Sequence, residues 1–163
     1  PVLHKPFQIK LRSTDQSILE NLQDPGNLGT MIRTGEGAGI TGVIMNQQTV
    51  DIFNPKTIRA TMGSIFRVPF VYVPELSTVL TQIHERGIHT YAAHLKGQKY
   101  YDSFSFREPT AFLIGNEGNG LTKEISDQAG QYLKIPMEGK VESLNASIAA
   151  ALLMYEAHRQ RNL

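Results

Sequence analysis

A helical segment near the start of the chain carries residue types that a binding or catalytic site could use. In DPGNLGTMIRTGEGAGI, residues 24–40, Asn27 is predicted as a helix cap and Arg33 follows nearly two turns later. Four glycines crowd this short helix, and each costs about 0.5–1 kcal/mol relative to alanine in a helix interior. That cost indicates close packing by backbone or a ligand. Taken alone, however, the segment is more typical of a capped helix with a surface arginine.

A glycine-rich loop follows an apolar run in FLIGNEGNGLTKE, residues 112–124. Gly115 and Gly120 have the spacing of a phosphate-binding P-loop, but Leu121 stands where that motif needs lysine. Glu117 in the middle of the loop would repel a triphosphate. The segment therefore favours close backbone approach to a neutral or cationic ligand, with a tight capped turn as the structural alternative.

The third segment, YLKIPMEGKVESLNASIAA at residues 132–150, is a strand, a loop and the start of the last helix. We expect that helix to begin at Ser143. Ser143 and Asn145 are either ordinary cap residues that face water or residues that line a ligand site.

Composition excludes several functions. The 163 residues carry a net charge of +1, which gives no global electrostatic argument for nucleic acid. The chain has no cysteine, which fits a cytoplasmic protein, and it has no segment long enough to span a membrane. Its five histidines lack metal-ligand spacing, so no metal is expected.

Apolar runs alternate with helical patterns along the chain. This alternation predicts an α/β fold, a mostly parallel sheet covered by helices on both faces. Ligands bind such sheets beyond the carboxyl ends of the strands. Helices are expected after Asn27, after Asn54-Pro55 and up to Gly87, and loops at 1–14 and 96–109. The expected strands are 18–21, 42–45, 70–73, 88–93, 111–114 and 132–135.

Together the three segments resemble a known family. N-L-G-x-x-x-R-T, I-G-N-E-G-x-G-L and I-P-M-x-G-x-V-E-S-L-N-x-S-x-A, in that order, are similar to the motifs of the SpoU (TrmH-like) class of SPOUT RNA methyltransferases. The stretch at 54–70, NPKTIRATMGSIFRVPF, also resembles that family between its first two motifs. The resemblance covers nearly the whole chain from about residue 18 onward.

The resemblance implies a SPOUT-type fold whose C-terminal segment threads a deep trefoil knot. It also implies a homodimer that binds S-adenosylmethionine and releases S-adenosylhomocysteine. The implied reaction is methylation of a ribose 2′-hydroxyl in ribosomal or transfer RNA, with ribosomal RNA preferred. Methylation of an RNA base on the same fold, or a non-catalytic RNA-binding or assembly role, are the alternatives.

The resemblance also assigns residues by motif position. Arg33 matches the arginine assigned to the 2′-hydroxyl, and Asn27, Glu117 and Asn145 complete the implied catalytic set, with Asn27 and Glu117 holding Arg33 and the loops in place. We expect Arg33 to orient the hydroxyl rather than act as a base, because a guanidinium keeps its proton. The implied cofactor residues are Ala93, Leu95, Gly115, Asn116, Gly118, Ile135, Met137, Ser143, Leu144 and Asn145.

The resemblance leaves recognition of the RNA open. Many relatives carry a small N-terminal RNA-binding domain, which is not expected here. We expect a single catalytic domain over 1–163, with 1–14 as a loosely ordered extension. Because the net charge is near zero, RNA contacts are expected from local residues such as Lys56, Arg59 and Arg67, which could equally be solvated surface charges.

Overall fold

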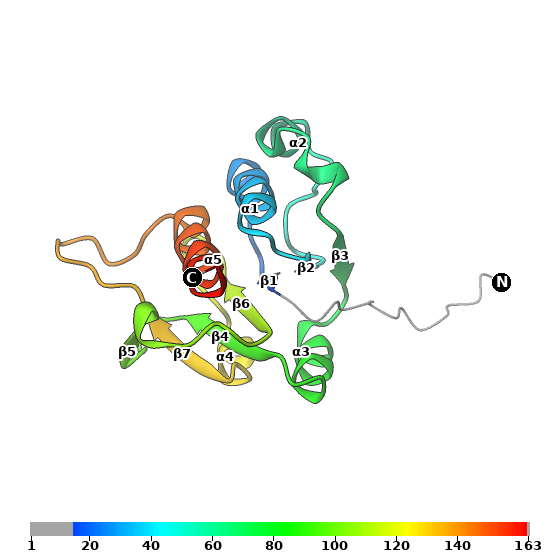
Figure 1. Ribbon diagram of the computed structural model, residues 1–163. Coiled ribbons are helices and arrows are strands. Elements are labelled where there is room, and N and C mark those ends of the chain that lie inside the picture. Colours follow the sequence, from blue (N-terminus) through cyan, green and yellow to red (C-terminus); the bar gives the residue numbers. More distant parts are fainter. Residues whose placement is uncertain (1–14, 163) are drawn as a thin grey trace.

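A seven-stranded sheet forms the centre of the computed structural model, which describes residues 15–162 (Figure 1). The strand order is β3-β2-β1-β6-β4-β7-β5, and each neighbouring pair is parallel. The six predicted strands are confirmed with small shifts at their ends. The strands are β1 Gln16–Leu19, β2 Gly42–Asn46, β3 Phe70–Val73, β4 His89–Ala93, β5 Lys99–Tyr100, β6 Thr110–Ile114 and β7 Gln131–Lys134.

The strand β5 was not predicted, since it lies in the stretch 96–109 that was expected to be loop. It is two exposed residues long and has no buried face. No apolar run or alternation could therefore indicate it. The expected extension at 1–14 lies outside the described residues.

Helices cover both faces of the sheet, as the sequence predicted (Figure 1). On one face lie α1 and α5, with α2 packed on α1, and on the other lie α3 and α4. Two short 3-10 turns, η1 and η2, complete the elements. The bounds are α1 Pro25–Ala38, α2 Pro55–Thr61, α3 Leu76–Glu85, α4 Lys123–Asp127, α5 Ala146–Arg161, η1 Ser64–Phe66 and η2 Tyr101–Ser103.

The central strand β6 is buried along its whole length and pairs with β1 on one side and β4 on the other. Apolar side chains of α1 and α5, among them Met31 and Leu153, pack over it from one face. Side chains of α3, such as Leu80 and Ile83, form the core on the opposite face. Burial on both faces explains why the strands are short continuous apolar runs.

Two predicted helix caps are wrong, and the errors are informative. The side chain of Asp24, not that of Asn27, caps α1, because Pro25 occupies the first helical position. Of the two expected cap residues of the last helix, Asn145 is confirmed, because its side chain accepts from the backbone N–H of Ser147 at 2.8 Å, whereas Ser143 lies before the helix, which begins at Ala146. The predicted cap Asn54 of α2 is confirmed.

The glycines of α1 permit close packing within the protein. A Cβ added at Gly29 would lie 2.5 Å from the Cβ of Ala60 and 2.6 Å from the carbonyl oxygen of Thr57. Only glycine lets α2 approach α1 so closely. The close packing that the glycines predicted is thus, at Gly29, contact with a neighbouring helix rather than with a ligand.

Candidate functional site

A cavity of about 310 Å³ opens at the carboxyl ends of β4, β6 and β7. This is the edge where ligands bind parallel α/β sheets, as the sequence analysis expected. Three chain segments that follow these strands form its walls, and the first turn of α5 closes it. It is lined by Ala93, His94, Leu95, Ile114, Gly115, Asn116, Glu117, Gly118, Asn119, Gly120, Leu121, Lys134, Ile135, Met137, Glu142, Ser143, Leu144, Ala146 and Ala149.

One wall is the 115–121 loop, which hydrogen bonds hold in a tight fold. Asn116 and Gly120 pair through their backbones at 3.0 and 2.9 Å. The Asn116 side chain accepts from the N–H groups of Gly118 and Asn119, and donates to the carbonyl of Asn21 at 2.9 Å. A Cβ on Gly115 would overlap the backbone of Gly120. The loop therefore folds back on itself instead of forming an open cradle for phosphate.

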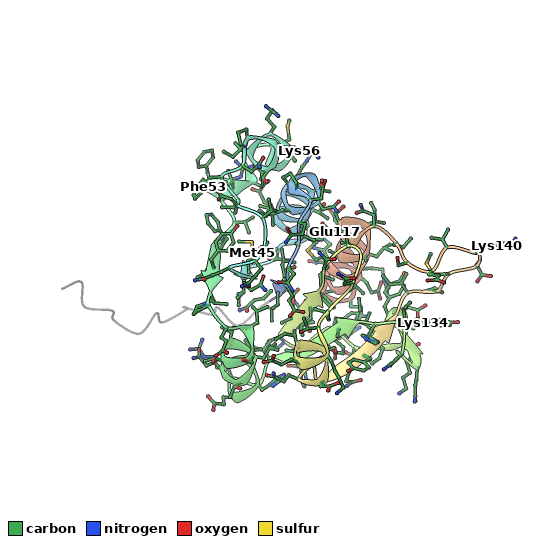
Figure 2. All side chains as sticks on the ribbon, turned by 180° about the vertical axis from the view of Figure 1, so that it is seen from behind. Met45, Phe53, Lys56, Glu117, Lys134 and Lys140 are labelled. Carbon is green, nitrogen blue, oxygen red and sulfur yellow. The ribbon has the colours of Figure 1, made fainter. Side chains whose placement is uncertain are left out.

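The other wall is the 135–144 segment, which has no such support. Within the described part of the chain, no hydrogen bond or ion pair joins this segment to another residue. Figure 2 shows its tip, labelled at Lys140, projecting away from the rest of the molecule. Val141 in this tip is 63% exposed. No polar contact within residues 15–162 therefore fixes the shape of this wall.

A hydrogen-bonded chain of three side chains joins the three motifs. The amide of Asn27 donates to the Glu117 carboxylate at 3.1 Å and accepts from the Asn145 amide at 3.0 Å. Because Asp24 caps α1, the Asn27 side chain is free to make this bridge. The structure thus brings together three of the four predicted catalytic residues.

The carboxylate of Glu117 is the anchor of this network. Its oxygens also accept from the backbone N–H groups of Gln23 at 3.1 Å and Asp24 at 2.9 Å. Partial burial acts to raise the pKa of Glu117, but the bonds from Asp24, Asn27 and Gln23 outweigh it and hold the pKa below its ordinary value. Glu117 is therefore a charged side chain that joins the 115–121 loop to the start of α1 through hydrogen bonds.

Arg33, the fourth predicted catalytic residue, lies apart from this network. It is exposed on α1, and its guanidinium bonds to no other described residue. It does not line the cavity, and it lies about 9 Å along the helix from Asn27 at 1.5 Å per residue. The expectation that Asn27 and Glu117 hold Arg33 in place is therefore not met by any direct bond.

The predicted cofactor residues line the cavity together, with the exception of Asn145. Asn145 lies beside the cavity and contributes through Asn27 and the cap of α5. Among the nine lining residues that sequence reasoning missed are His94, Lys134 and Glu142. These three lie next to a predicted residue or within the same loop, so continuity along the loop was the available signal.

The predicted RNA-contacting residues lie around α2, away from the cavity. Lys56 forms an ion pair with Asp24 at 3.3 Å, whereas the exposed guanidinium of Arg59 bonds to no other described residue. Arg67 forms an ion pair with Glu36 of α1. Hydrogen bonds from Arg67 and then Ser64 lower the pKa of Glu36 to about 2.

Two further findings limit the chemistry within residues 15–162. No three histidine, aspartate or glutamate side chains there gather into a group that could hold a metal ion. No helix in that range is long and apolar enough to cross a membrane.

Comparison with known proteins identifies the relatives of this chain. The 23S rRNA (guanosine(2553)-2′-O)-methyltransferase RlmP of Bacillus subtilis is 35% identical over 154 residues, which is 94% of this chain and 62% of RlmP. The structure of the SpoU methyltransferase AviRb from Streptomyces viridochromogenes with its cofactor AdoMet superposes with a TM-score of 0.88 at 32% identity. That match covers 97% of this chain and 62% of AviRb.

A third relative is similar over nearly its whole length. It is a structure described by the 2-OH methylation of C/U34 on tRNA, with a TM-score of 0.83 at 28% identity, covering 92% of this chain and 97% of that one. By contrast, the chain spans about three fifths of the length of RlmP and of the similar TrmH-family proteins. The sequence pattern of the SpoU rRNA Methylase family matches residues 17–155. The chain therefore belongs to the SpoU rRNA Methylase family.

Proposed function

We propose that the cavity binds S-adenosylmethionine. Its volume of about 310 Å³ lies at the lower end of the range for small-molecule pockets, roughly 300–1,000 Å³. The 115–121 loop presents backbone rather than bulky side chains. The carboxylates of Glu117 and Glu142 outnumber the one lysine of the lining, Lys134, and a net negative lining suits a sulfonium cation. The AdoMet-bound structure of AviRb supports the same cofactor.

We infer that the bound cofactor serves methylation of an RNA ribose 2′-hydroxyl. When bound, S-adenosylmethionine supplies an electrophilic methyl group. Arg33 orients the hydroxyl and stabilises charge that develops on its oxygen, while the hydroxyl proton leaves to solvent. Asn27, Glu117 and Asn145 are positioning residues that fix the two loops around the cofactor. The hydrogen-bonded chain that unites the three motifs carries this proposal.

The names of the relatives support RNA as the substrate. RlmP is named for a guanosine 2′-O position in 23S rRNA, and another relative is described by methylation of C/U34 on tRNA. Ribosomal RNA is the first substrate to test because RlmP is the more similar in sequence.

The test uses radiolabelled S-adenosylmethionine and total RNA from a strain that lacks this protein. After incubation, the RNA is digested to nucleosides, which are then separated. Label in a 2′-O-methyl nucleoside is the expected result, and it identifies the base attached to that ribose. Label on a base would replace ribose methylation by base methylation. Absence of label, with cofactor binding retained in calorimetry, would favour a non-catalytic role.

We also propose that the protein works as a homodimer through the exposed face of α5. Ile148, Leu152 and Tyr155 lie on this face at spacings of four and three residues and are 49%, 37% and 48% exposed. The Tyr155 hydroxyl would lie 2.9 Å from a Cβ at Gly37 of α1, one turn beyond Arg33. If a second copy docks on this face, Arg33 of one subunit lies close to the surface of the other subunit. Arg33 could then act in the cavity of the partner, although it does not line the cavity of its own subunit.

Mixed dimers test this arrangement. Arg33→Ala removes the proposed reactive group, and Gly115→Ala disrupts the cavity. Each variant alone is expected to have little activity: Arg33→Ala because the reactive group is lost, and Gly115→Ala when the cofactor concentration is kept below the raised Kd. If Arg33 acts across the interface, mixing the two variants restores activity in one of the two sites of each mixed dimer. Activity that stays absent in verified mixed dimers would place Arg33 and cavity in the same subunit.

The deep trefoil knot implied by the family is likewise a proposal. The last helix, α5, contacts both β6 and α1, although α1 lies at the other end of the sequence. These contacts are compatible with a knot. Pulling the chain from both ends in a single-molecule experiment would measure the length of the unfolded chain. A knot would make this length shorter than that of the fully extended chain, and full extension would disprove it.

A further inference from the structure

Four large apolar side chains are exposed in one short stretch, the 53–66 face, which comprises α2 and η1. Phe53, Ile58, Met62 and Phe66 are 62%, 39%, 68% and 87% exposed. Figure 2 shows Phe53 and Lys56 at the α2 end of the molecule, far from the projecting tip at Lys140. Clusters of exposed apolar side chains of this kind commonly mark interaction sites.

The local backbone holds these side chains outward. Thr57 and Thr61 are buried against α1, which leaves the opposite side of α2 in solvent. Met62 ends the helix with φ of 49°, in the left-handed region that is unfavourable for a residue with a side chain, and Gly63 follows with φ of 85°. Phe53 is fixed by an edge-to-face contact with Phe70, at 6.0 Å between ring centroids. The face is therefore shaped in advance of binding.

Both cations and carboxylates border this apolar surface, and two of the cations are unpaired among the described residues. Arg59 projects from α2 and, within residues 15–162, forms no ion pair. Arg33 lies on α1 between Gly29, which contacts α2, and Glu36, which bonds to Ser64 and Arg67. Lys56 and Arg67 are each paired with a carboxylate, so Arg33 and Arg59 are the cations left to attract an external anion.

Exposed aromatic rings beside free guanidinium groups match the chemistry of unpaired RNA. Bases stack on aromatic side chains, and arginine binds the phosphates between them. A double helix would offer phosphates but keep its bases stacked inside, which would leave Phe66 without a partner. The charge and shape of the face therefore fit a single-stranded segment better than a duplex.

We propose that the 53–66 face binds the unpaired bases that flank the methylated nucleotide. The Phe66 ring stacks on a base and Arg59 contacts a neighbouring phosphate, which guides the ribose toward Arg33. This inference rests on the proposed RNA methylation. It predicts that the RNA substrate is a single strand or a loop rather than a continuous duplex.

The test compares two fluorescently labelled single-stranded RNA oligonucleotides in anisotropy titrations at fixed salt. One is an ordinary sequence, and the other has the same length but contains abasic nucleotides, so that only phosphate and sugar contacts remain. The wild-type protein is expected to bind the ordinary strand more tightly. Phe66→Ala should weaken this binding about tenfold and leave binding of the abasic strand unchanged, because the lost interaction is stacking.

Two further variants make the result specific. Tyr100→Ala removes another half-exposed aromatic ring, on β5 at the opposite edge of the sheet from β3, and should change neither affinity. Arg59→Ala should weaken binding of both strands alike and reduce the salt dependence. Melting temperatures verify folding, which is expected to persist because Phe66 is 87% exposed.

Three outcomes would overturn the proposal. Phe66→Ala could weaken both strands equally or neither strand, which would exclude stacking. It could convert a dimer to a monomer in sedimentation, which would make the face an interface between copies. The wild-type protein could fail to bind either strand. Calorimetry with S-adenosylmethionine, which uses no RNA, would then decide separately whether the proposed cofactor site stands.

Discussion

The two walls of the cavity differ in how they keep their shape. The 115–121 loop is held by its own backbone pair, by the Asn116 side chain and by four bonds to or from Asn21, Gln23, Asp24 and Asn27. The 135–144 segment has no hydrogen bond to another residue within 15–162. One wall is thus formed before a ligand arrives, whereas the other is free to adjust around it.

This difference indicates a division of labour in the proposed site. The fixed loop can define the shape that the cofactor must match, at little entropic cost on binding. The adjustable segment can open to admit the cofactor and then pack over it. Asn145 joins the two walls, since it follows the adjustable segment and bonds to Asn27, which in turn bonds to Glu117 of the fixed loop.

The largest effect is expected at Arg33, which belongs to neither wall. Arg33→Ala should reduce methyl transfer by about 100-fold or more, because a donor to a developing oxyanion is lost. Cofactor affinity in calorimetry should be unchanged, since Arg33 does not line the cavity. Full activity in this variant would mean that one of the walls supplies the chemistry instead.

Glycine substitutions test the contrast between the walls directly. Gly115→Ala forces a Cβ into the backbone of Gly120 and should destabilise the protein by about 2 kcal/mol, lowering Tm by about 4–8 °C. Cofactor binding should weaken at least about tenfold. In the matched variant Gly139→Ala the new Cβ meets nothing within 4 Å, so Tm and affinity should hardly change. Equal effects at the two positions would contradict the contrast.

The link between the walls is tested at Asn145. Asn145→Ala removes the cap of α5 and the bond to Asn27, and should lower stability by about 1 kcal/mol. Asn54→Ala removes the cap of α2 and should cost a similar amount. Only Asn145→Ala should also weaken cofactor binding, as measured by calorimetry. The same loss of affinity in both variants would reduce the role of Asn145 to capping.

The smallest effect concerns the pH dependence contributed by Glu117. Its pKa is lowered in the folded protein, so the carboxylate stabilises the fold above the ordinary glutamate value of about 4.3. This contribution is lost as pH falls through the lowered pKa. The difference in unfolding free energy between wild type and Glu117→Gln should be constant near neutrality, stay under about 1 kcal/mol because the group is exposed, and shrink below about pH 4.3. If the curves of unfolding free energy against pH for the two proteins stayed parallel down to low pH, the charge of Glu117 would not contribute to stability.

The arrangement of strands and helices could be predicted because burial on both faces leaves a clear apolar pattern. Local details were harder. Asp24 and Asn27 are both good cap residues, and the position of Pro25 decides between them. Ser143 and Asn145 are also both good cap residues, and the sequence does not show that only Asn145 makes the capping bonds of α5.

Contacts between distant segments carry no local signal in a single sequence. The bond from Asn27 to Glu117 spans 90 residues, and the bond from Asn145 to Asn27 spans 118. Only the resemblance to a family placed these residues in one site. The free state of Arg33 and the pairing of Glu36 with Arg67 likewise depend on how α1 meets α2, which the sequence pattern does not specify.

The position of β6 in the sheet has a consequence for how the chain folds during synthesis. β6 separates β1 from β4, although it follows both in the sequence, so the two halves of the sheet meet only through residues 110–114. Until these residues leave the ribosome, the inner edges of β1 and β4 are unpaired and open to wrong partners. We expect β6 insertion to be a slow, late step, since it joins segments far apart in the chain.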